Sequence, residues 1–291
     1  MQAIRDRVIL VTGATDGLGR EVARDLAEQG ATVLLHGHNP RKGEACLQAI
    51  RSATGNDKLK YYNADFSSLK ATHRLAEGLR ADQSRLDVLI NNAGVGGRPG
   101  TRIRRESTDG HELCFAVNYL ASYLLTCRLL PLLRQSSPSR IVNVTSAGQW
   151  PINFDDVMLE RTYDGFRAYA QSKLAQVMFT VDLAEALAES GVTVNSLHPA
   201  TLMHTNMVRE CFGRSMTTVQ QGADAVVYLA TSPDLDGITG EYFDGKRRAR
   251  ADPQAYDKEA RRRLRQLSTR LIGLQRSDQS THRLNCTLAT Q

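Results

Sequence analysis

A chain of 291 residues that is 41% hydrophobic and 23% charged can bury a sizeable core, so its composition excludes a mainly disordered protein. Its five cysteines are scattered and form no CxxC pair, which argues against a disulfide framework or a zinc site and favours a reducing compartment. The formal net charge is +6, but residues 246–291 hold twelve Lys or Arg against four Asp or Glu, so the tail carries the basic character. No nucleic-acid-binding motif accompanies that charge, and we expect no nucleic-acid partner.

The first predicted strand, residues 8–11, starts close to Met1. This leaves no room for a signal peptide, and we expect a cytoplasmic protein. We also expect no uninterrupted apolar run of membrane-spanning length. Attachment to a membrane surface through the basic C-terminal helix is kept as a minor alternative.

A glycine-rich turn, TGATDGLG at residues 12–19, joins this strand to a predicted helix over residues 20–27. In such a unit, glycines make the tight turn and let the backbone approach a pyrophosphate, while the helix N-terminus favours its negative charge. Structural turns also contain such glycines. The position between a strand and a helix nevertheless favours a dinucleotide site.

Residues 36–42, after a second strand, bear on the choice of dinucleotide. An acid there would bind both hydroxyls of the adenosine ribose and favour NAD, whereas basic residues accommodate a 2′-phosphate. The segment has no acid and contains His38, Arg41 and Lys42. We therefore expect NADP(H) to be favoured over NAD(H). His36 and His38 lack a third ligand, so no metal site is expected.

Strands and helices continue to alternate along the chain. Strands are expected at residues 8–11, 31–35, 59–63, 86–90, 140–145, 192–197 and about 241–243. Helices are expected at residues 20–27, 41–53, 69–81, 115–130, 165 onwards and 219–230. This alternation predicts one α/β domain over residues 1–275, a doubly wound Rossmann-type fold with about seven parallel strands and helices on both faces.

Polar residues at the expected strand ends are candidates for a site. Asp65 either meets an adenine or caps the next helix. The sequence NNAG at residues 91–94 lets the backbone turn close beside a cofactor. Asn118, on an otherwise apolar helix, either bonds to neighbouring backbone or distorts the helix and holds a water. Ser146 follows the fifth strand, where a hydroxyl suits chemistry and a plain turn equally.

Tyr169 and Lys173 are the centre of the predicted chemistry. They lie four residues apart on one helix and so project from the same face. A phenol has an ordinary pKa of about 10, and a neighbouring ammonium lowers this pKa by stabilising the phenolate. The spacing alone also fits an ordinary surface pair. Ser146 and the glycine-rich turn favour the chemical interpretation.

With these motifs in order, the chain resembles the short-chain dehydrogenase/reductase family, in its retinol-dehydrogenase-like branch. The matching residues are 12–19, 65, 91–94, 109–118, 146, 169–173 and 198–199. They span about residues 8–274 and keep the family's order and approximate spacing. Ala200 stands where the family more often has glycine, so the resemblance does not define the backbone conformation beside the nicotinamide.

The resemblance implies an NAD(P)-dependent oxidoreductase that moves hydride between nicotinamide and a carbonyl or alcohol. It implies that Tyr169 exchanges the proton, that Lys173 lowers the tyrosine pKa and holds the nicotinamide ribose, that Ser146 orients the substrate oxygen and that Asn118 supports a water. The cofactor-binding residues it implies are Gly13, Thr15, Asp16, Gly17, Leu18, Gly19, His38, Asn39, Arg41, Asp65, Phe66, Asn92, Ala93, Gly94, Tyr169, Lys173, Pro199 and Thr201.

The last third of the chain is predicted to hold a lid, a basic helix and a tail. Methionines within residues 200–218 suggest a flexible substrate lid and a lipophilic substrate, or routine packing. A basic helix at about 253–273 would pack its apolar stripe against the body or a partner subunit. Residues 276–291 are expected to be disordered, and we expect a homo-oligomer.

Two other functions stay open at this stage. One is a non-catalytic dinucleotide-binding sensor that controls a protein contact. The other is an epimerase or dehydratase on the same fold, which would keep its cofactor without net consumption.

Overall fold

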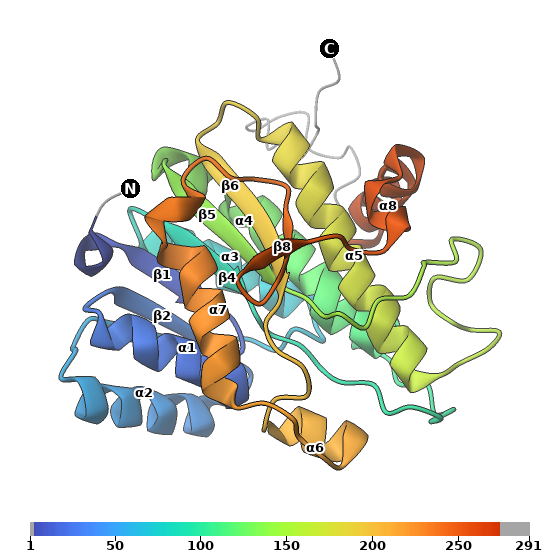
Figure 1. Ribbon diagram of the computed structural model, residues 1–291, viewed down its shortest axis with the longest axis horizontal. Helices are drawn as coiled ribbons and strands as arrows, with labels where there is room; N and C mark the ends of the chain where they lie inside the picture. Colours follow the sequence, from blue (N-terminus) through green and yellow to red (C-terminus); the bar gives the residue numbers. More distant parts are fainter. Residues whose placement is uncertain (1–2, 274–291) are drawn as a thin grey trace.

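A mostly parallel sheet forms the middle layer of the protein (Figure 1). The structure is a computed structural model that describes residues 3–273. The strands are β1 (Val8–Val11), β2 (Thr32–Gly37), β3 (Leu59–Asn63), β4 (Val88–Asn91), β5 (Ser139–Val144), β6 (Val192–His198), β7 (Tyr242–Asp244) and β8 (Arg247–Ala249). They lie in the order β3-β2-β1-β4-β5-β6-β7-β8. Because the order reverses at β1, the carboxyl ends of β1 and β4 flank the point where such sheets bind ligands.

Helices cover both faces of this sheet. They are α1 (Gly17–Glu28), α2 (Pro40–Thr54), α3 (Leu69–Asp82), α4 (Ala121–Gln135), α5 (Gly165–Ala186), α6 (Asn206–Phe212), α7 (Val219–Thr231) and α8 (Lys258–Leu271). Shorter helical segments are η1 (Ile4–Asp6), η2 (Phe115–Leu120), η3 (Pro233–Leu235) and η4 (Pro253–Tyr256). One core contains α1, α2 and α7, and the other contains α3, α4 and α5 (Figure 1). The predicted doubly wound fold is confirmed.

The sheet has one strand more than the sequence predicts. β8 pairs antiparallel with β7 after a two-residue turn in which Gly245 has a φ of +59°. A glycine at the first central position suits such a tight hairpin, since it adopts positive φ without a side-chain clash. The short strand escapes prediction because its residues, Arg247–Ala249, show no apolar alternation.

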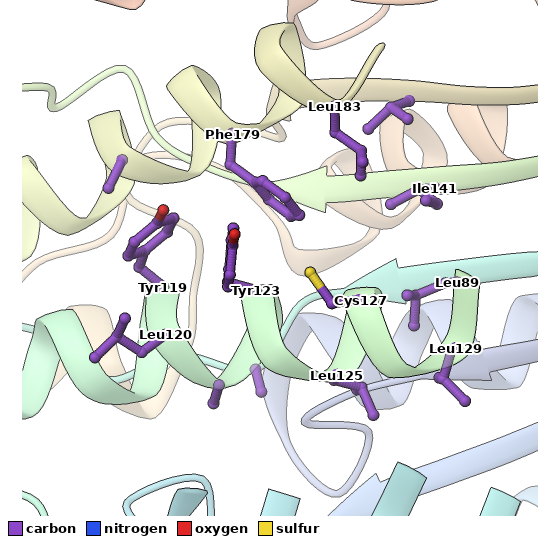
Figure 2. Close-up of a cluster of buried hydrophobic side chains, with 14 of the residues drawn as sticks. Leu89, Tyr119, Leu120, Tyr123, Leu125, Cys127, Leu129, Ile141, Phe179 and Leu183 are labelled. Carbon is purple, nitrogen blue, oxygen red and sulfur yellow. The ribbon is translucent and has the colours of Figure 1, made fainter. Parts of the chain in front are cut away.

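The core beneath α4 and α5 is rich in aromatic side chains (Figure 2). Tyr123 and Phe179 face each other with ring centroids 4.9 Å apart. The helical stretch Phe115–Gln135 is long and apolar enough on average to cross a membrane, although Asn118 and Arg128 interrupt its apolar sequence. The burial of 89% of its apolar window inside the protein explains that composition without a membrane.

The basic helix α8 packs against α5 (Figure 1), and its hydroxyl groups reach Tyr119 in η2 and Tyr123 in α4. The hydroxyl groups of Tyr119 and Ser268 are hydrogen-bonded at 2.7 Å. Arg265 binds the Asp182 carboxylate with oxygens at 2.5 and 2.7 Å. The basic residues therefore partly neutralise acids of the body, and the apolar stripe lies inside. The predicted tail at 276–291 lies outside the described residues.

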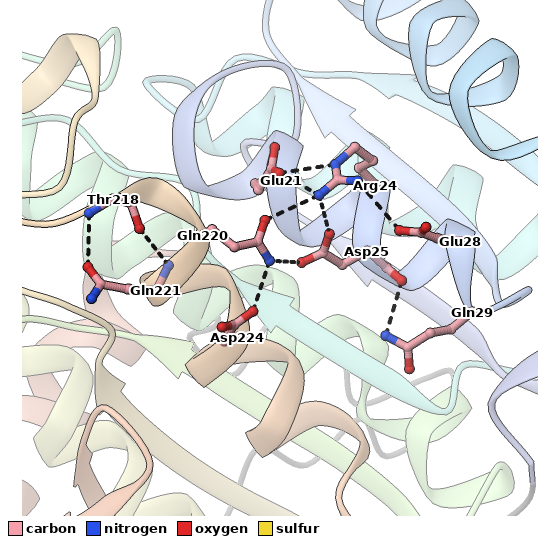
Figure 3. A network of polar contacts seen from close by, with 9 residues as sticks. All are labelled: Glu21, Arg24, Asp25, Glu28, Gln29, Thr218, Gln220, Gln221 and Asp224. Atoms are coloured by element: carbon pink, nitrogen blue, oxygen red, sulfur yellow. Dashed lines mark hydrogen bonds and ion pairs between the residues drawn. The ribbon is translucent and has the colours of Figure 1, made fainter.

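A polar network holds α7 beside α1, next to the glycine-rich turn (Figure 3). Arg24 binds Glu21 at 2.6 Å and Asp25 at 2.7 Å, and Gln220 donates to Asp25 at 2.7 Å. A capping box at Thr218 starts α7. The end of the predicted lid is thus fixed to the body.

Truncating Leu264 in α8 is expected to destabilise the protein. Its side chain is buried against α5, and Leu264→Ala leaves a cavity that costs about 2–4 kcal/mol. Urea unfolding measures this loss. Gln266→Ala, on the exposed side of α8, is the control and should change the unfolding free energy by less than about 0.5 kcal/mol. Equal effects would contradict the docking of α8.

Candidate active site

A cavity of about 740 Å³ opens at the carboxyl ends of the central strands. Sixteen of the residues predicted to bind a cofactor line it: Gly13, Thr15, Asp16, Gly17, Leu18, Gly19, His38, Asp65, Phe66, Asn92, Ala93, Gly94, Tyr169, Lys173, Pro199 and Thr201. Asn39 and Arg41 do not line it. Asn39 instead caps α2 by accepting a hydrogen bond from the Lys42 N–H at 3.1 Å.

The glycine-rich turn is pressed against the loop after β4. Gly13 has a φ of +66°, and a Cβ there would lie 2.8 Å from the Ala93 Cα. A Cβ on Gly19 would lie 2.2 Å from the Gly13 oxygen. Only glycine fits both positions. Asp16 caps α1 and accepts from the Gly17 N–H at 2.7 Å, so a carboxylate lies within the turn.

Thr12 joins this turn to the loop after β4. Its buried hydroxyl accepts from the N–H groups of Asn92 at 2.9 Å and Ala93 at 3.0 Å. It donates to the Ile90 oxygen at 3.2 Å. The Asn92 amide in turn donates to the Thr12 oxygen at 2.8 Å. One side chain therefore sets the spacing between the two loops that border the cavity.

The adenosine end of the cavity is formed by residues after β2 and β3. His36 is buried and stacks on Phe66 with ring centroids 4.2 Å apart. Burial lowers the pKa of His36 to about 4, so it is neutral. No cluster that could hold a metal ion occurs within residues 3–273. Asp65 does not cap α3, because Ser68 does so, and Asp65 accepts from the Ser67 N–H.

Tyr169, Lys173 and Ser146 meet at the other end of the cavity. The Lys173 Nζ lies 5.8 Å from the centre of the Tyr169 ring, and Ser146 lines the same cavity. Lys173 Nζ donates to the Val144 oxygen at 3.0 Å and to Gln176 Oε1 at 2.9 Å. The three side chains come from the end of β5 and from α5, as their sequence positions predict.

Burial dominates the electrostatics of this group. It lowers the pKa of Lys173 to about 8, because a buried ammonium loses its hydration. It raises the pKa of Tyr169, and the Ser146 side chain only partly opposes that. Whether the Lys173 ammonium lowers the pKa of the phenol stays a prediction; in this arrangement, desolvation is the largest influence on that pKa.

Asn118 lies in η2, a π-helical segment, so the helix is distorted there. Its Oδ1 accepts from the Val95 N–H at 2.7 Å, and its Nδ2 donates to the Val95 oxygen at 3.1 Å and to Ser172 Oγ at 2.9 Å. Asn118 is fully buried and does not line the cavity. In this structure Asn118 fixes the loop around Val95, and Val95 does line the cavity.

The lid region closes one side of the cavity through α6 and the loop before it. Phe212 packs edge-on against Phe166 at 6.2 Å, and Asn206 donates to Asp16 Oδ2 at 2.7 Å. Met203, Met207 and Cys211 are also on the lining. Further apolar lining residues, missed in the sequence, are Val95, Leu113, Val117 and Phe166. In the sequence, these apolar residues cannot be distinguished from residues that pack in the core.

The cavity fits a nicotinamide dinucleotide. A glycine-rich turn and a helix N-terminus suit the pyrophosphate, and a Cβ on Gly94 would lie 3.1 Å from Asn118 Oδ1 and 3.5 Å from Lys173 Nζ. Glycine thus keeps room in front of the lysine. The phenol, hydroxyl and ammonium at the far end can exchange a proton with an oxygen and orient it.

Comparisons with known proteins agree with this geometry. Residues 7–214 match the short chain dehydrogenase family model. The chain is 38% identical to retinol dehydrogenase 13 of Mus musculus, over 93% of this chain and 85% of the relative. It is 37% identical to retinol dehydrogenase 11 of Homo sapiens, over 92% and 86%. A short chain dehydrogenase structure from Escherichia coli, complexed with NADPH, is 29% identical with a TM-score of 0.68, covering 83% of this chain and 97% of that chain.

Replacing Thr12 by Val is expected to destabilise the two loops that border the cavity. The substitution leaves the buried Ala93 N–H without its acceptor and the Asn92 N–H with the Ile90 oxygen alone, which costs about 1–3 kcal/mol. Urea unfolding measures the loss. Thr12→Ser keeps the hydroxyl and should retain most of the stability. If Val and Ser variants were equally stable, the hydroxyl would have no such role.

Proposed function

Because this chain belongs to the short-chain dehydrogenase family, it is an oxidoreductase that uses a nicotinamide cofactor on a small carbonyl or alcohol, and we propose that its substrate is lipophilic and its cofactor NADP(H). One observation carries the proposal. Tyr169, Ser146 and Lys173 gather at one end of a cavity whose other end is the glycine-rich turn. The cofactor would supply or accept the hydride at the end of the cavity that holds Tyr169.

Tyr169 is the proposed proton donor for reduction. Its raised pKa keeps the phenol protonated at neutral pH, so it can give a proton to the oxygen of a carbonyl. Ser146, which also lines the cavity, would hold the same oxygen and orient it. In the oxidation direction the phenolate must form, and the Lys173 charge 5.8 Å from the ring favours it.

Lys173 is the proposed holder of the nicotinamide ribose. An ammonium has three hydrogen-bond donors, and Val144 and Gln176 accept two of them. Lys173 lines the cavity, so its remaining donor is available to a ribose hydroxyl. Below its pKa of about 8 the group is charged, which serves both the ribose contact and the phenolate.

A lipophilic substrate is supported by the apolar wall beside Tyr169. Val95, Val117, Phe166 and Phe212 border the reacting end, and Met207 adds an adaptable side chain. Such a surface favours an apolar substrate, because binding then removes apolar surface from water on both sides. A polar substrate would lose its hydration without gaining hydrogen bonds from this wall. We also propose that Asn118 shapes this wall indirectly. Its amide is hydrogen-bonded to the backbone of Val95, which lines the cavity.

The preference for NADP(H) is supported by the charge after β2. His38 lines the cavity, and Arg41 and Lys42 are exposed in the first turn of α2, outside it. Long basic side chains at this place can turn to a 2′-phosphate, and no acid competes for the ribose. The NADPH complex of the similar Escherichia coli protein agrees with this preference.

A cytoplasmic location and a homo-oligomer stay predictions. A homo-oligomer would have to use surfaces other than the face of α4 and α5 on which α8 packs.

Tyr169→Phe is expected to reduce turnover by about 10²–10⁴-fold while leaving NADPH binding nearly intact, because it removes the phenolic hydroxyl that exchanges the proton and keeps the ring. The assay follows NADPH consumption with a panel of lipophilic aldehydes and ketones, and fluorescence titration gives the dissociation constant. Wild-type turnover in the variant would refute the role of Tyr169. NADPH binding without any consumption by the wild-type protein would favour a non-catalytic sensor.

Arg41→Ala removes a positive charge near the proposed position of the 2′-phosphate. It is expected to weaken NADPH binding about fivefold and to leave NADH binding unchanged, because only NADPH carries the 2′-phosphate. The matched control is Arg51→Ala, at the far end of the same helix, which should alter neither constant. Equal weakening of NADPH and NADH binding would contradict the proposed contact.

A further inference from the structure

Gln176 lies on α5, one turn after Lys173, and reaches back to the ammonium. Its Oε1 accepts from Lys173 Nζ at 2.9 Å. The residue is almost fully buried. It does not line the cavity, so it touches the proposed chemistry only through Lys173.

The burial of this amide needs a reason beyond packing. Within the described residues, Gln176 Nε2 is buried and has no hydrogen-bond partner. A buried, unpaired N–H group is unfavourable, and an apolar side chain of similar volume would avoid it. The glutamine accepts a hydrogen bond from Lys173, which Met or Leu at this position could not do.

The position of Gln176 is fixed by a seam of polar contacts between β5 and α5. Asn143 Nδ2 donates to Thr180 Oγ1 at 2.8 Å, and Thr180 Oγ1 donates to the Gln176 backbone oxygen at 2.9 Å. Val144, the next residue of β5, supplies the other acceptor of Lys173. The seam therefore holds both acceptors of the ammonium in register.

A neutral acceptor suits the surroundings of Lys173. The titratable groups that face the ammonium are Tyr169 on α5 and Cys114 just before η2. Burial raises the pKa of the Cys114 thiol, which stays neutral. A carboxylate at 176 would neutralise the positive charge that the phenolate needs, whereas an amide stabilises the ammonium and leaves its charge uncompensated.

We propose that Gln176 is a positioning residue that keeps the Lys173 ammonium protonated and directed at the cavity. This rests on the proposed function, because that function places Lys173 beside the reacting groups. The two hydrogen bonds from behind, to Val144 and Gln176, leave the third donor on the cavity side. Without Gln176, the buried ammonium would lose one of two protein acceptors and release its proton at lower pH.

The test compares Gln176→Met, which removes the acceptor at similar volume, with Gln176→Glu, which adds a charge. Gln171→Met is the matched control. Gln171 is another buried glutamine on α5 with half of its amide unpaired, and it donates to the Val157 oxygen instead of contacting Lys173. Urea unfolding checks that each variant is folded before it is titrated.

The first readout uses the protein without cofactor. ¹³C-labelled lysine is followed by NMR from pH 6 to 10, and Lys173→Met identifies the Lys173 Cε signal. The midpoint should lie near 8 in the wild type and in Gln171→Met. It should move down by about one pH unit in Gln176→Met and up in Gln176→Glu.

The second readout is the pH dependence of carbonyl reduction and of NADPH binding. Both need the charged lysine, so both should weaken above its pKa. In Gln176→Met the loss should begin about one pH unit lower than in the wild type. In Gln176→Glu it should begin higher.

An unchanged Lys173 midpoint in Gln176→Met, or an equal change in Gln171→Met, would overturn the proposal. If Gln176→Met does not fold, an unchanged midpoint in Gln176→Glu would do the same. Failure of the proposed function is seen separately, as absent turnover in the wild type, and it leaves the lysine titration valid.

Discussion

The burial of one ammonium group is the constraint on which the candidate site depends. Lys173 can stay charged away from bulk water only where oxygen atoms replace its lost hydration, and β5 and α5 supply these at Val144 and Gln176. That requirement fixes the distance between the end of the strand and the helix. It thereby also places Ser146 and Tyr169, which belong to the same two elements, at one end of the cavity.

The parallel sheet and most of the lining could be predicted from the sequence. Apolar strands followed by amphipathic helices indicate the doubly wound order, and residues after strand ends must gather at one edge. This is why Asp65, the loop at 91–94 and Ser146 were found from their positions alone. Glycine identified the tight turns, because close approach to Ala93 leaves no room for a Cβ at Gly13.

Other features depend on burial, which a local pattern does not contain. Gln176 has the spacing of an ordinary helical surface residue, yet it is buried behind Lys173. Desolvation likewise raises the pKa of Tyr169, an effect that the spacing of Tyr169 and Lys173 does not reveal. The family resemblance implies Asn39 as a cofactor-binding residue, but in the structure Asn39 caps α2. The strand β8 was missed because its pairing comes from a turn and not from hydrophobic alternation.

The position of α8 in the chain has a consequence for synthesis. The aromatic core between α4 and α5 is completed by residues around Ser268, which leave the ribosome long after the helices that they cover. Until then, the nascent chain exposes an apolar surface that favours aggregation. Maturation of this half of the protein therefore waits until α8 has been synthesised, and a premature stop before residue 258 would leave this layer of the fold without its covering helix.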